Sequence, residues 1–269
     1  MRNIIKMEWS KIRRCQILLV GIVALALCPV VQYGSYLIME AEYRDPYYDF
    51  AHLFANVIWG NSQIFLPISL VMMGGWFIDR ETVNDTLKNI VTIPVPMPKL
   101  LGAKLIVTGI LAIVFGFYSV VVTLLTGLIV GLPGLTLELV VHCGAQVVAA
   151  SLTTYLVCMP LILIFGQIRG GYPGGSILTF FLGYSILFFK GGILASAYPF
   201  SAALILVGYN MKEYNGATSA PNPVLAAMGM MFVILMTAVL LAASNRYKEI
   251  KPRKTKKQKR RGSFFKERR

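Results

Sequence analysis

"GGWFIDRETVNDTLKNIVTIPVPMPKLLGAK", residues 74–104, is a polar and charged segment that separates two long apolar runs. Residues 79–93 within it have the pattern of an amphipathic helix. Its apolar stripe consists of side chains spaced three or four residues apart, namely Val83, Leu87, Ile90 and Val91. The sequence therefore predicts a helix with one apolar face between two apolar runs.

The ends of this predicted helix carry their own signals. Asp79 or Asp85 can accept hydrogen bonds from the free amides of its first turn. Three prolines are expected to end it, because proline lacks an amide hydrogen and clashes with the preceding turn: Pro94, Pro96 and Pro98. Two roles are possible for this predicted helix. Either it lies on the lipid surface, or its apolar stripe enters a groove on a cytoplasmic partner.

The composition places the whole chain in a membrane. Of the 269 residues, 56% are hydrophobic and 14% are charged, and the mean hydropathy is +0.65. A soluble domain has about 25% charged residues. Repeated apolar runs of about 20 residues are typical of membrane helices, whereas a membrane barrel shows short alternating strands. We therefore predict an all-α, polytopic membrane protein.

We predict six transmembrane helices: residues 16–39, 56–78, 105–132, 137–168, 175–189 and 224–243. Residues 193–210 are apolar enough for a seventh span, but Pro199 divides them and a seventh span would place the basic tail outside. We interpret them as re-entrant outer half-helices between the fifth and sixth spans.

Two outer features have alternative interpretations. Lys190 either snorkels to the outer interface or lies in a transport pathway. The first outer loop, residues 40–50, carries four acidic residues and three tyrosines. It is either an interfacial aromatic girdle or a surface that receives a cationic, amphipathic substrate.

The basic residues set the orientation. Of the 26 Lys and Arg residues, 23 fall on the side of the N-terminus, the 79–104 loop, Arg169 and the tail, and three fall on the other side. Both termini are therefore predicted to be cytoplasmic. Thirteen of the 26 lie in residues 245–269, which we expect to be disordered and to bind anionic membrane lipid. The net charge of +14 thus indicates topology and lipid, with no nucleic acid as partner.

Candidates for chemistry are few. The four cysteines lie in or beside apolar runs without a CxxC pair, and we interpret them as small buried hydrophobes. His52 is placed in an outer loop. Glu138 and His142 lie one helical turn apart, but two ligands do not make a metal site, so we expect a hydrogen-bonded pair. No GxxxxGK[ST] motif is present to hold ATP. We predict that this chain is not an enzyme and has no metal site and no cofactor of its own.

The N-terminal segment "MRNIIKMEWSKIRR", residues 1–14, predicts a second amphipathic helix. Ile5, Trp9 and Ile12 form its stripe, and basic side chains flank it. Such a helix lies in the headgroup plane, as an elbow that leads into the first span.

The order of these features resembles the permease subunits of type-2 ABC exporters, and among them the bacitracin-resistance and lantibiotic-immunity permeases. The residues that carry the resemblance are Glu8 and Lys11 in the elbow and Glu81, Thr86, Leu87, Pro94, Lys99 and Lys104 around the opening segment. The resemblance covers essentially the whole chain. Asp85 departs from it, since the family often has a small residue such as glycine there, and the triple proline is heavier than usual.

The resemblance implies roles for these segments. Residues 79–93 are the coupling helix, which docks into a separate ATPase subunit. Its candidate residues are Glu81, Val83, Thr86, Leu87, Lys88, Ile90 and Val91, and those of the elbow are Glu8, Trp9 and Lys11. Residues 1–244 are the six-helix ABC-2 type transmembrane domain, and residues 245–269 are the tail.

Further expectations concern partners and function. The resemblance implies two ATPase copies that bind ATP and Mg, a second permease chain, and a bacterial plasma membrane. The expected function is the ATP-driven export of an antimicrobial peptide or amphiphile. Substrate would meet the faces of the first, second and fifth spans, with unknown contact residues. The alternatives are a membrane-embedded enzyme and a secondary transporter or channel without an ATPase. The last of these usually keeps ionisable groups at mid-span.

Overall fold

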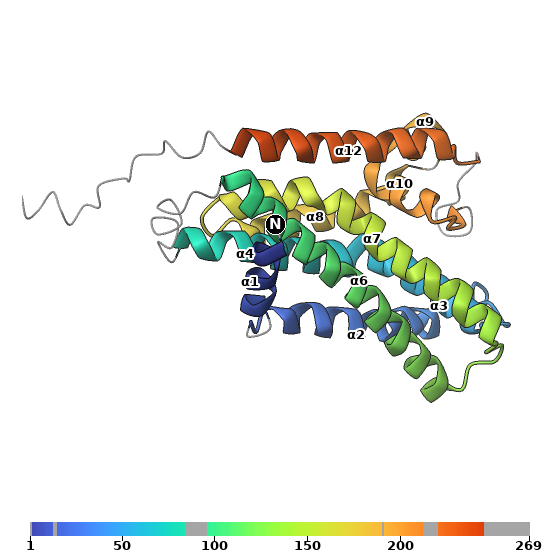
Figure 1. The fold of residues 1–269 in the computed structure, drawn as a ribbon. Helices are drawn as coiled ribbons and strands as arrows, with labels where there is room; N and C mark the ends of the chain where they lie inside the picture. The colour runs from blue at the N-terminus through green and yellow to red at the C-terminus, as the bar shows by residue number, and fades with distance from the viewer. Residues whose placement is uncertain (1, 13–14, 84–95, 190, 212–219, 245–269) are drawn as a thin grey trace, which may run out of the picture.

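A computed structural model describes the chain except for residues 1, 13–14, 84–95, 190, 212–219 and 245–269. The described residues form helices and no strands, which confirms the all-α class (Figure 1). Among the described residues, five helical stretches are long and apolar enough to cross a membrane. They are α2 (Leu18–Ile38), the stretch Phe50–Glu81, α6 (Met97–Val130), α7 (Leu137–Gln167) and α12 (Pro223–Ala243).

The second stretch consists of three consecutive elements. An α-helix, α3 (Phe50–Gly60), passes into a π-turn, η1 (Asn61–Phe65), which continues as α4 (Leu66–Val83). In η1 the amide of Leu66 bonds the carbonyl oxygen of Asn61, five residues back instead of four.

The predicted fifth span is shorter than the other five. It consists of α8 (Tyr172–Tyr184) and a 3₁₀ turn, η2 (Ser185–Phe188). Two short helices follow, α9 (Gly192–Ala197) and α10 (Pro199–Leu206). They divide at Pro199, where the sequence predicted a break. Their re-entrant position and the sixth membrane crossing stay predictions.

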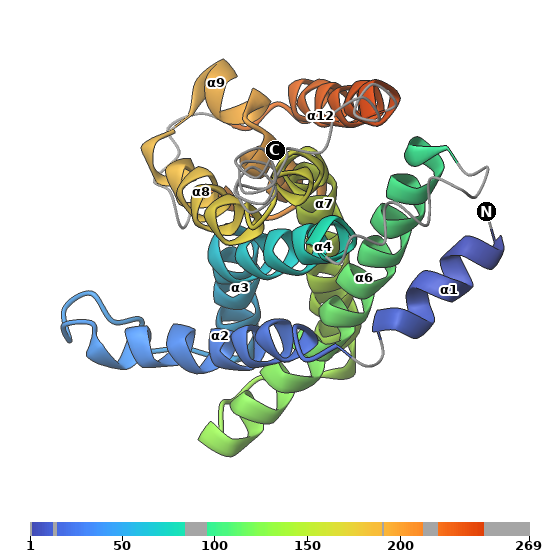
Figure 2. The same cartoon turned by 90° about the vertical axis from the view of Figure 1, so that its left-hand side faces the viewer.

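α4 lies at the centre of the bundle (Figure 2) and packs against α7, α8, α2 and α6. In the stretch Phe50–Glu81, 72% of the most apolar window is buried inside the chain, against 22% for α2 and for α12. The outer faces of α2 and α12 are therefore available for lipid or for another chain.

Three helix boundaries differ from the predictions by five residues or more. α3 begins at Phe50, although we predicted the second span from residue 56. α4 runs through Val83, although we predicted that the span would end at Ile78 and that a separate helix would begin at Asp79. The polar residues at 79–81 continue the helix because their side chains have partners inside the bundle. The interpretation of Asp79 as a first-turn cap is therefore wrong.

The third difference is the start of α6. We predicted the third span from residue 105, but α6 begins at Met97. Pro98 lies in its first turn, where the missing amide hydrogen would have had no partner in any case. Pro98 thus starts a helix rather than ending one. A short helix, α1 (Arg2–Ile12), precedes α2 and packs against α6.

Candidate functional site

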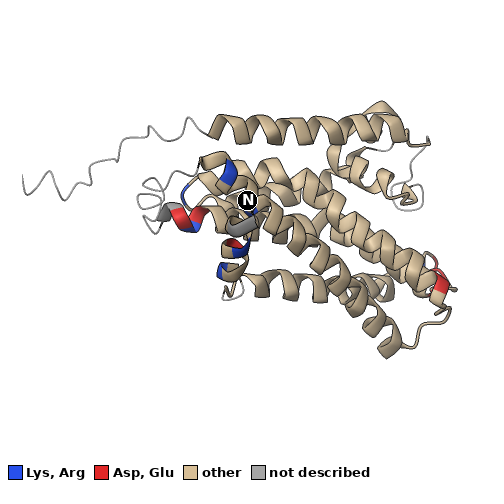
Figure 3. Ribbon diagram, viewed as in Figure 1, with Lys and Arg blue, Asp and Glu red and all other residues tan. Residues whose placement is uncertain are grey.

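Two acidic and two basic side chains meet between α1, α4 and α6, and we call them the four-charge cluster: Glu8, Lys11, Glu81 and Lys104. Figure 3 shows charged segments of these helices at one end of the bundle. Lys104 Nζ lies 2.7 Å from Glu8 Oε2 and 3.0 Å from Glu81 Oε1. Lys11 Nζ lies 2.6 Å from Glu8 Oε1 and 3.1 Å from Glu81 Oε1. Each base thus bridges both acids.

Lys104 is the buried centre of the cluster, with only 3% of its side chain exposed. An ammonium group has three donors, and here each has an acceptor, because Nζ also donates to the backbone oxygen of Phe77 at 2.8 Å. Complete pairing of this kind offsets the large cost of taking a charge out of water. Lys104 therefore links α1 to α4 and anchors both to α6.

The pKa shifts in α1 follow from this pairing. Burial alone would raise the pKa of Glu8, but Lys104 and Lys11 outweigh it and hold that pKa below its usual value. Burial alone would lower the pKa of Lys11, but Glu8 and Glu81 outweigh it and raise that pKa. Both groups are therefore charged at neutral pH.

Asp79 and Arg80, which directly precede Glu81 in α4, contact other parts of the chain. Asp79 is buried, and its Oδ1 accepts a hydrogen bond from the amide of Gly170, 3.0 Å away in the turn between α7 and α8. Arg80 donates to Cys15 Sγ at 3.1 Å and lies over the ring of Trp76. The last described turn of α4 thus contacts the α7–α8 turn, the segment between α1 and α2, and α6.

The other predicted residues divide into two groups. Trp9 is 37% exposed and takes no part in the four-charge cluster. The backbone of Val83 ends α4. Five candidates of the coupling helix lie outside the described residues: Thr86, Leu87, Lys88, Ile90 and Val91. Sequence reasoning identified the members of the four-charge cluster separately and did not predict that they pair with one another.

A second feature, the polar π-turn η1, was not predicted from the sequence. Asn61, Ser62 and Gln63 are each at most 2% exposed. Asn61 Nδ2 donates to Ser119 Oγ in α6 at 2.8 Å. Within the described part of the chain, Asn61 Oδ1, Ser62 Oγ and Gln63 Nε2 have no hydrogen-bond partner. The signal was visible in the sequence as three polar residues in the middle of an apolar run. Such π-turns are common at functional sites.

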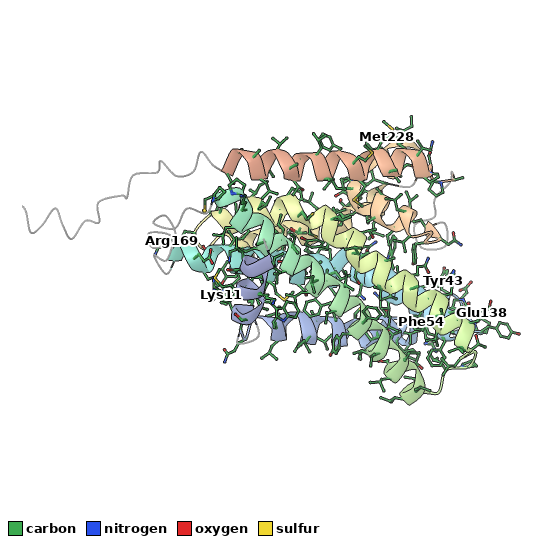
Figure 4. All side chains as sticks on the ribbon, viewed as in Figure 1. Lys11, Tyr43, Phe54, Glu138, Arg169 and Met228 are labelled. Carbon is green, nitrogen blue, oxygen red and sulfur yellow. The ribbon has the colours of Figure 1, made fainter. Side chains whose placement is uncertain are left out.

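The opposite end of the bundle carries Tyr43 and Glu138, far from Lys11 and Arg169 (Figure 4). His52 lies there too, but its place in an outer loop was predicted wrongly. It belongs to the first turn of α3, where its amide donates to the capping carboxylate of Asp49. The His52 ring lies 2.8 Å from Asp49 Oδ1 and 3.2 Å from Asp45 Oδ2.

At the same end, an open groove of about 1400 Å³ lies between α7 and the end of α10. Its lining is mainly apolar and includes Glu138, His142 and Gln146. The prediction of a hydrogen bond between Glu138 and His142 is wrong, because these two side chains do not contact each other through a hydrogen bond. No group of three metal-ligating side chains occurs among the described residues.

Comparison with known proteins identifies the family of the chain. A family model described as "ABC-2 family transporter protein" matches residues 4–186, more than half of its length. The chain belongs to the ABC-2 transporter family. It is also similar to bacitracin transport permease protein BCRB of Bacillus licheniformis, with 26% identity over 179 residues. That alignment covers 65% of this chain and 84% of the relative.

Membership of the ABC-2 family settles the class of protein. The chain is a membrane subunit of an ABC transporter, which is a transport subunit and not itself an enzyme. This disfavours the alternatives of a secondary transporter, a channel and a membrane-embedded enzyme. The matched residues include all four members of the four-charge cluster and the π-turn η1.

Proposed function

We propose that this ABC-2 permease exports an antimicrobial peptide or a similar amphiphile, driven by two copies of a separate ATPase subunit that bind ATP and Mg. Two permease chains form the pathway. The part of the predicted coupling helix that follows α4, residues 84–93, binds the ATPase. The proposal rests on the family and on the bacitracin permease relative. The four-charge cluster is the structural observation that carries the mechanism.

The four-charge cluster has members on both sides of residues 84–95, the connection between α4 and α6 that the ATPase would move. Glu81 comes three residues before the undescribed segment 84–95, and Lys104 comes nine residues after it. Because both contact Glu8 or Lys11 of α1, a displacement of the connection acts on α4, α6 and α1 together. Asp79 carries the same displacement to α7 and α8. Closure of the two ATPase subunits on ATP would thus move these helices together.

The substrate class also fits a site other than the expected faces of the first, second and fifth spans, namely the groove between α7 and α10. Its lining is mainly apolar, with the exposed carboxyl group of Glu138 at one end. A cationic amphiphile presents the matching surface, namely an apolar body and a positive group. We expect Glu138→Gln to lower resistance to such a compound in cells that carry the complete transporter. Glu249→Gln, which removes an acid from the basic tail, is the control. Equal resistance in both variants would reject the groove as the substrate site.

The test of the proposed function is purification in mild detergent from the native cells. We expect a second chain with a GxxxxGK[ST] motif to purify in stoichiometric amount. Leu87→Asp together with Ile90→Asp should release it, because both side chains lie on the apolar stripe of the predicted helix. Thr92→Asp adds a charge on the opposite side of that helix and should leave the complex intact.

Two results would contradict the proposal. One is a chain that purifies alone and moves solute into vesicles without ATP. The other is loss of the ATPase in the Thr92→Asp variant as well, which would mean that added charge, and not the apolar stripe, decides binding.

A further inference from the structure

A polar hollow lies beside the four-charge cluster, where α1 passes into α2. Its volume is about 500 Å³, and its lining residues are Ser10, Lys11, Cys15 and Arg80. We call it the elbow hollow. Neither the comparisons nor the proposed function gives it a role.

Among the described residues, the charges at the elbow hollow do not balance. Within the four-charge cluster, two acids compensate two bases. Arg80 adds a positive charge, and in the described part of the chain no carboxylate lies within 4.0 Å of its guanidinium group. Its contacts there are Cys15 Sγ and the ring of Trp76. The neighbouring acid, Asp79, bonds the amide of Gly170 instead. The hollow therefore suits an anion.

Its surroundings suit a lipid. Met7 and Trp9 of α1 are exposed, at 44% and 37%. α2 begins three residues after Cys15, and its Leu19 and Val23 are exposed by more than half. An apolar surface thus starts beside the hollow and continues along α2. A headgroup in the hollow would have its acyl chains on that surface.

We propose that the elbow hollow binds the phosphate group of an anionic phospholipid from the inner leaflet. The guanidinium group of Arg80 is the main contact, because its planar fork matches two phosphate oxygens. Lys11 pairs with Glu8 and Glu81 and can donate one further N–H hydrogen bond. The Ser10 hydroxyl group donates to the backbone oxygen of Met7 and can turn toward the phosphate instead. Basic pockets between helices at the cytoplasmic side are a known arrangement for anionic headgroups. The bound lipid would join α1 to α4 from outside the four-charge cluster.

The experiment is native mass spectrometry of the full-length chain in detergent, titrated with phosphatidylglycerol or phosphatidylcholine. We expect the first phosphatidylglycerol to bind more tightly than phosphatidylcholine. Arg80→Gln should weaken it about tenfold, the size of one lost charge-assisted contact. Lys6→Gln removes the same charge from an exposed position of α1 outside the hollow and should change binding less than twofold. Both variants keep the basic tail.

Several outcomes would overturn the proposal. One is an equal loss in Arg80→Gln and Lys6→Gln, which would indicate diffuse attraction by the basic surface. Another is complete displacement of the lipid by millimolar inorganic phosphate, which would make the hollow a site for free phosphate. If Arg80→Gln does not fold, Arg80→Lys and Ser10→Ala replace it. If Arg80→Lys and Ser10→Ala bind phosphatidylglycerol more weakly than Lys6→Gln does, the proposal is supported. If Arg80→Lys and Ser10→Ala both bind it as tightly as the wild type, the proposal is rejected.

Discussion

At the residue scale, Lys104 is the most informative position in the chain. The sequence alone made it a basic residue ahead of the third span, suited to the cytoplasmic interface. The structure buries it between two helices and satisfies all three of its donors. A hydropathy pattern cannot predict such a contact, because the partners lie far away in the sequence, at Glu8 and Glu81. The family resemblance identified the residues without their pairing.

Lys104→Met should destabilise the chain strongly. The substitution keeps the volume but removes one of the two bases that pair with the buried carboxylates of Glu8 and Glu81, which costs about 3–5 kcal/mol. Thermal unfolding in detergent measures the loss. Lys99→Met changes an exposed lysine of the same helix and should be nearly neutral. Similar unfolding temperatures for the two variants would show that the four-charge cluster contributes little to stability.

The pH dependence of stability should follow the same contacts. The pKa of Glu8 is lowered from 4.5, so its contribution is present above pH 4.5 and is lost as the pH falls through its folded-state pKa. The pKa of Lys11 is raised from 10.5, so its contribution is present below pH 10.5 and is lost as the pH rises through its folded-state pKa. Unfolding temperatures measured across this range should form a plateau. Glu8→Gln should flatten the acid side, and Glu40→Gln should not.

At the element scale, the sequence predicted most helices but not their joints. The apolar runs placed α2, α7 and α12 within two residues of the observed bounds. Pro199 correctly divided α9 from α10. The errors came where polar residues or prolines lie inside a helix, because these usually mark an end. Asp79 and Glu81 continue α4 since the bundle supplies their partners, and Pro98 is tolerated in the first turn of α6.

The contact between α8 and the π-turn gives a test at this scale. A Cβ atom on Gly183 would lie 2.1 Å from the backbone oxygen of Gln63, so that either α8 or η1 must move. Gly183→Ala should therefore lower the free energy of unfolding by about 1–3 kcal/mol. Gly174→Ala is the control in the same helix, since a Cβ atom there meets no atom within 4 Å. An unfolding temperature as high in Gly183→Ala as in Gly174→Ala would show that η1 adapts without cost.

At the scale of the whole molecule, the two ends of the bundle differ in chemistry. One end carries Lys11 and Arg169, and the other carries Tyr43 and Glu138 (Figure 4). α6 has 34 residues, roughly 50 Å at 1.5 Å per residue, whereas the hydrocarbon core is about 30 Å thick. It is therefore long enough to extend beyond the core. Charge counts predicted which end faces the cytoplasm, but the undescribed segments 84–95 and 245–269 carry many of those charges.

The orientation can be tested with thiol reagents. We expect a reagent that cannot cross the membrane to label Tyr47→Cys in intact cells, since Tyr47 is 83% exposed at the predicted outer side. Lys6→Cys in α1 should be labelled only after the cells are opened. The unsubstituted chain corrects for the native cysteines, of which Cys28 and Cys158 are buried. The reverse pattern would invert the predicted topology.

The π-turn η1 also has a consequence for how span two tolerates changes in length. A π-turn holds one residue more than the α-turn it replaces. Deletion of one residue from 61–65 would let α3 and α4 join as an uninterrupted α-helix without breaking the backbone hydrogen bonds on either side. Deletion of one residue from α4 instead would rotate everything beyond it by about 100°, and Asp79 and Glu81 would turn away from their partners. Span two therefore has one place where a deletion is absorbed, and it lies at the polar turn.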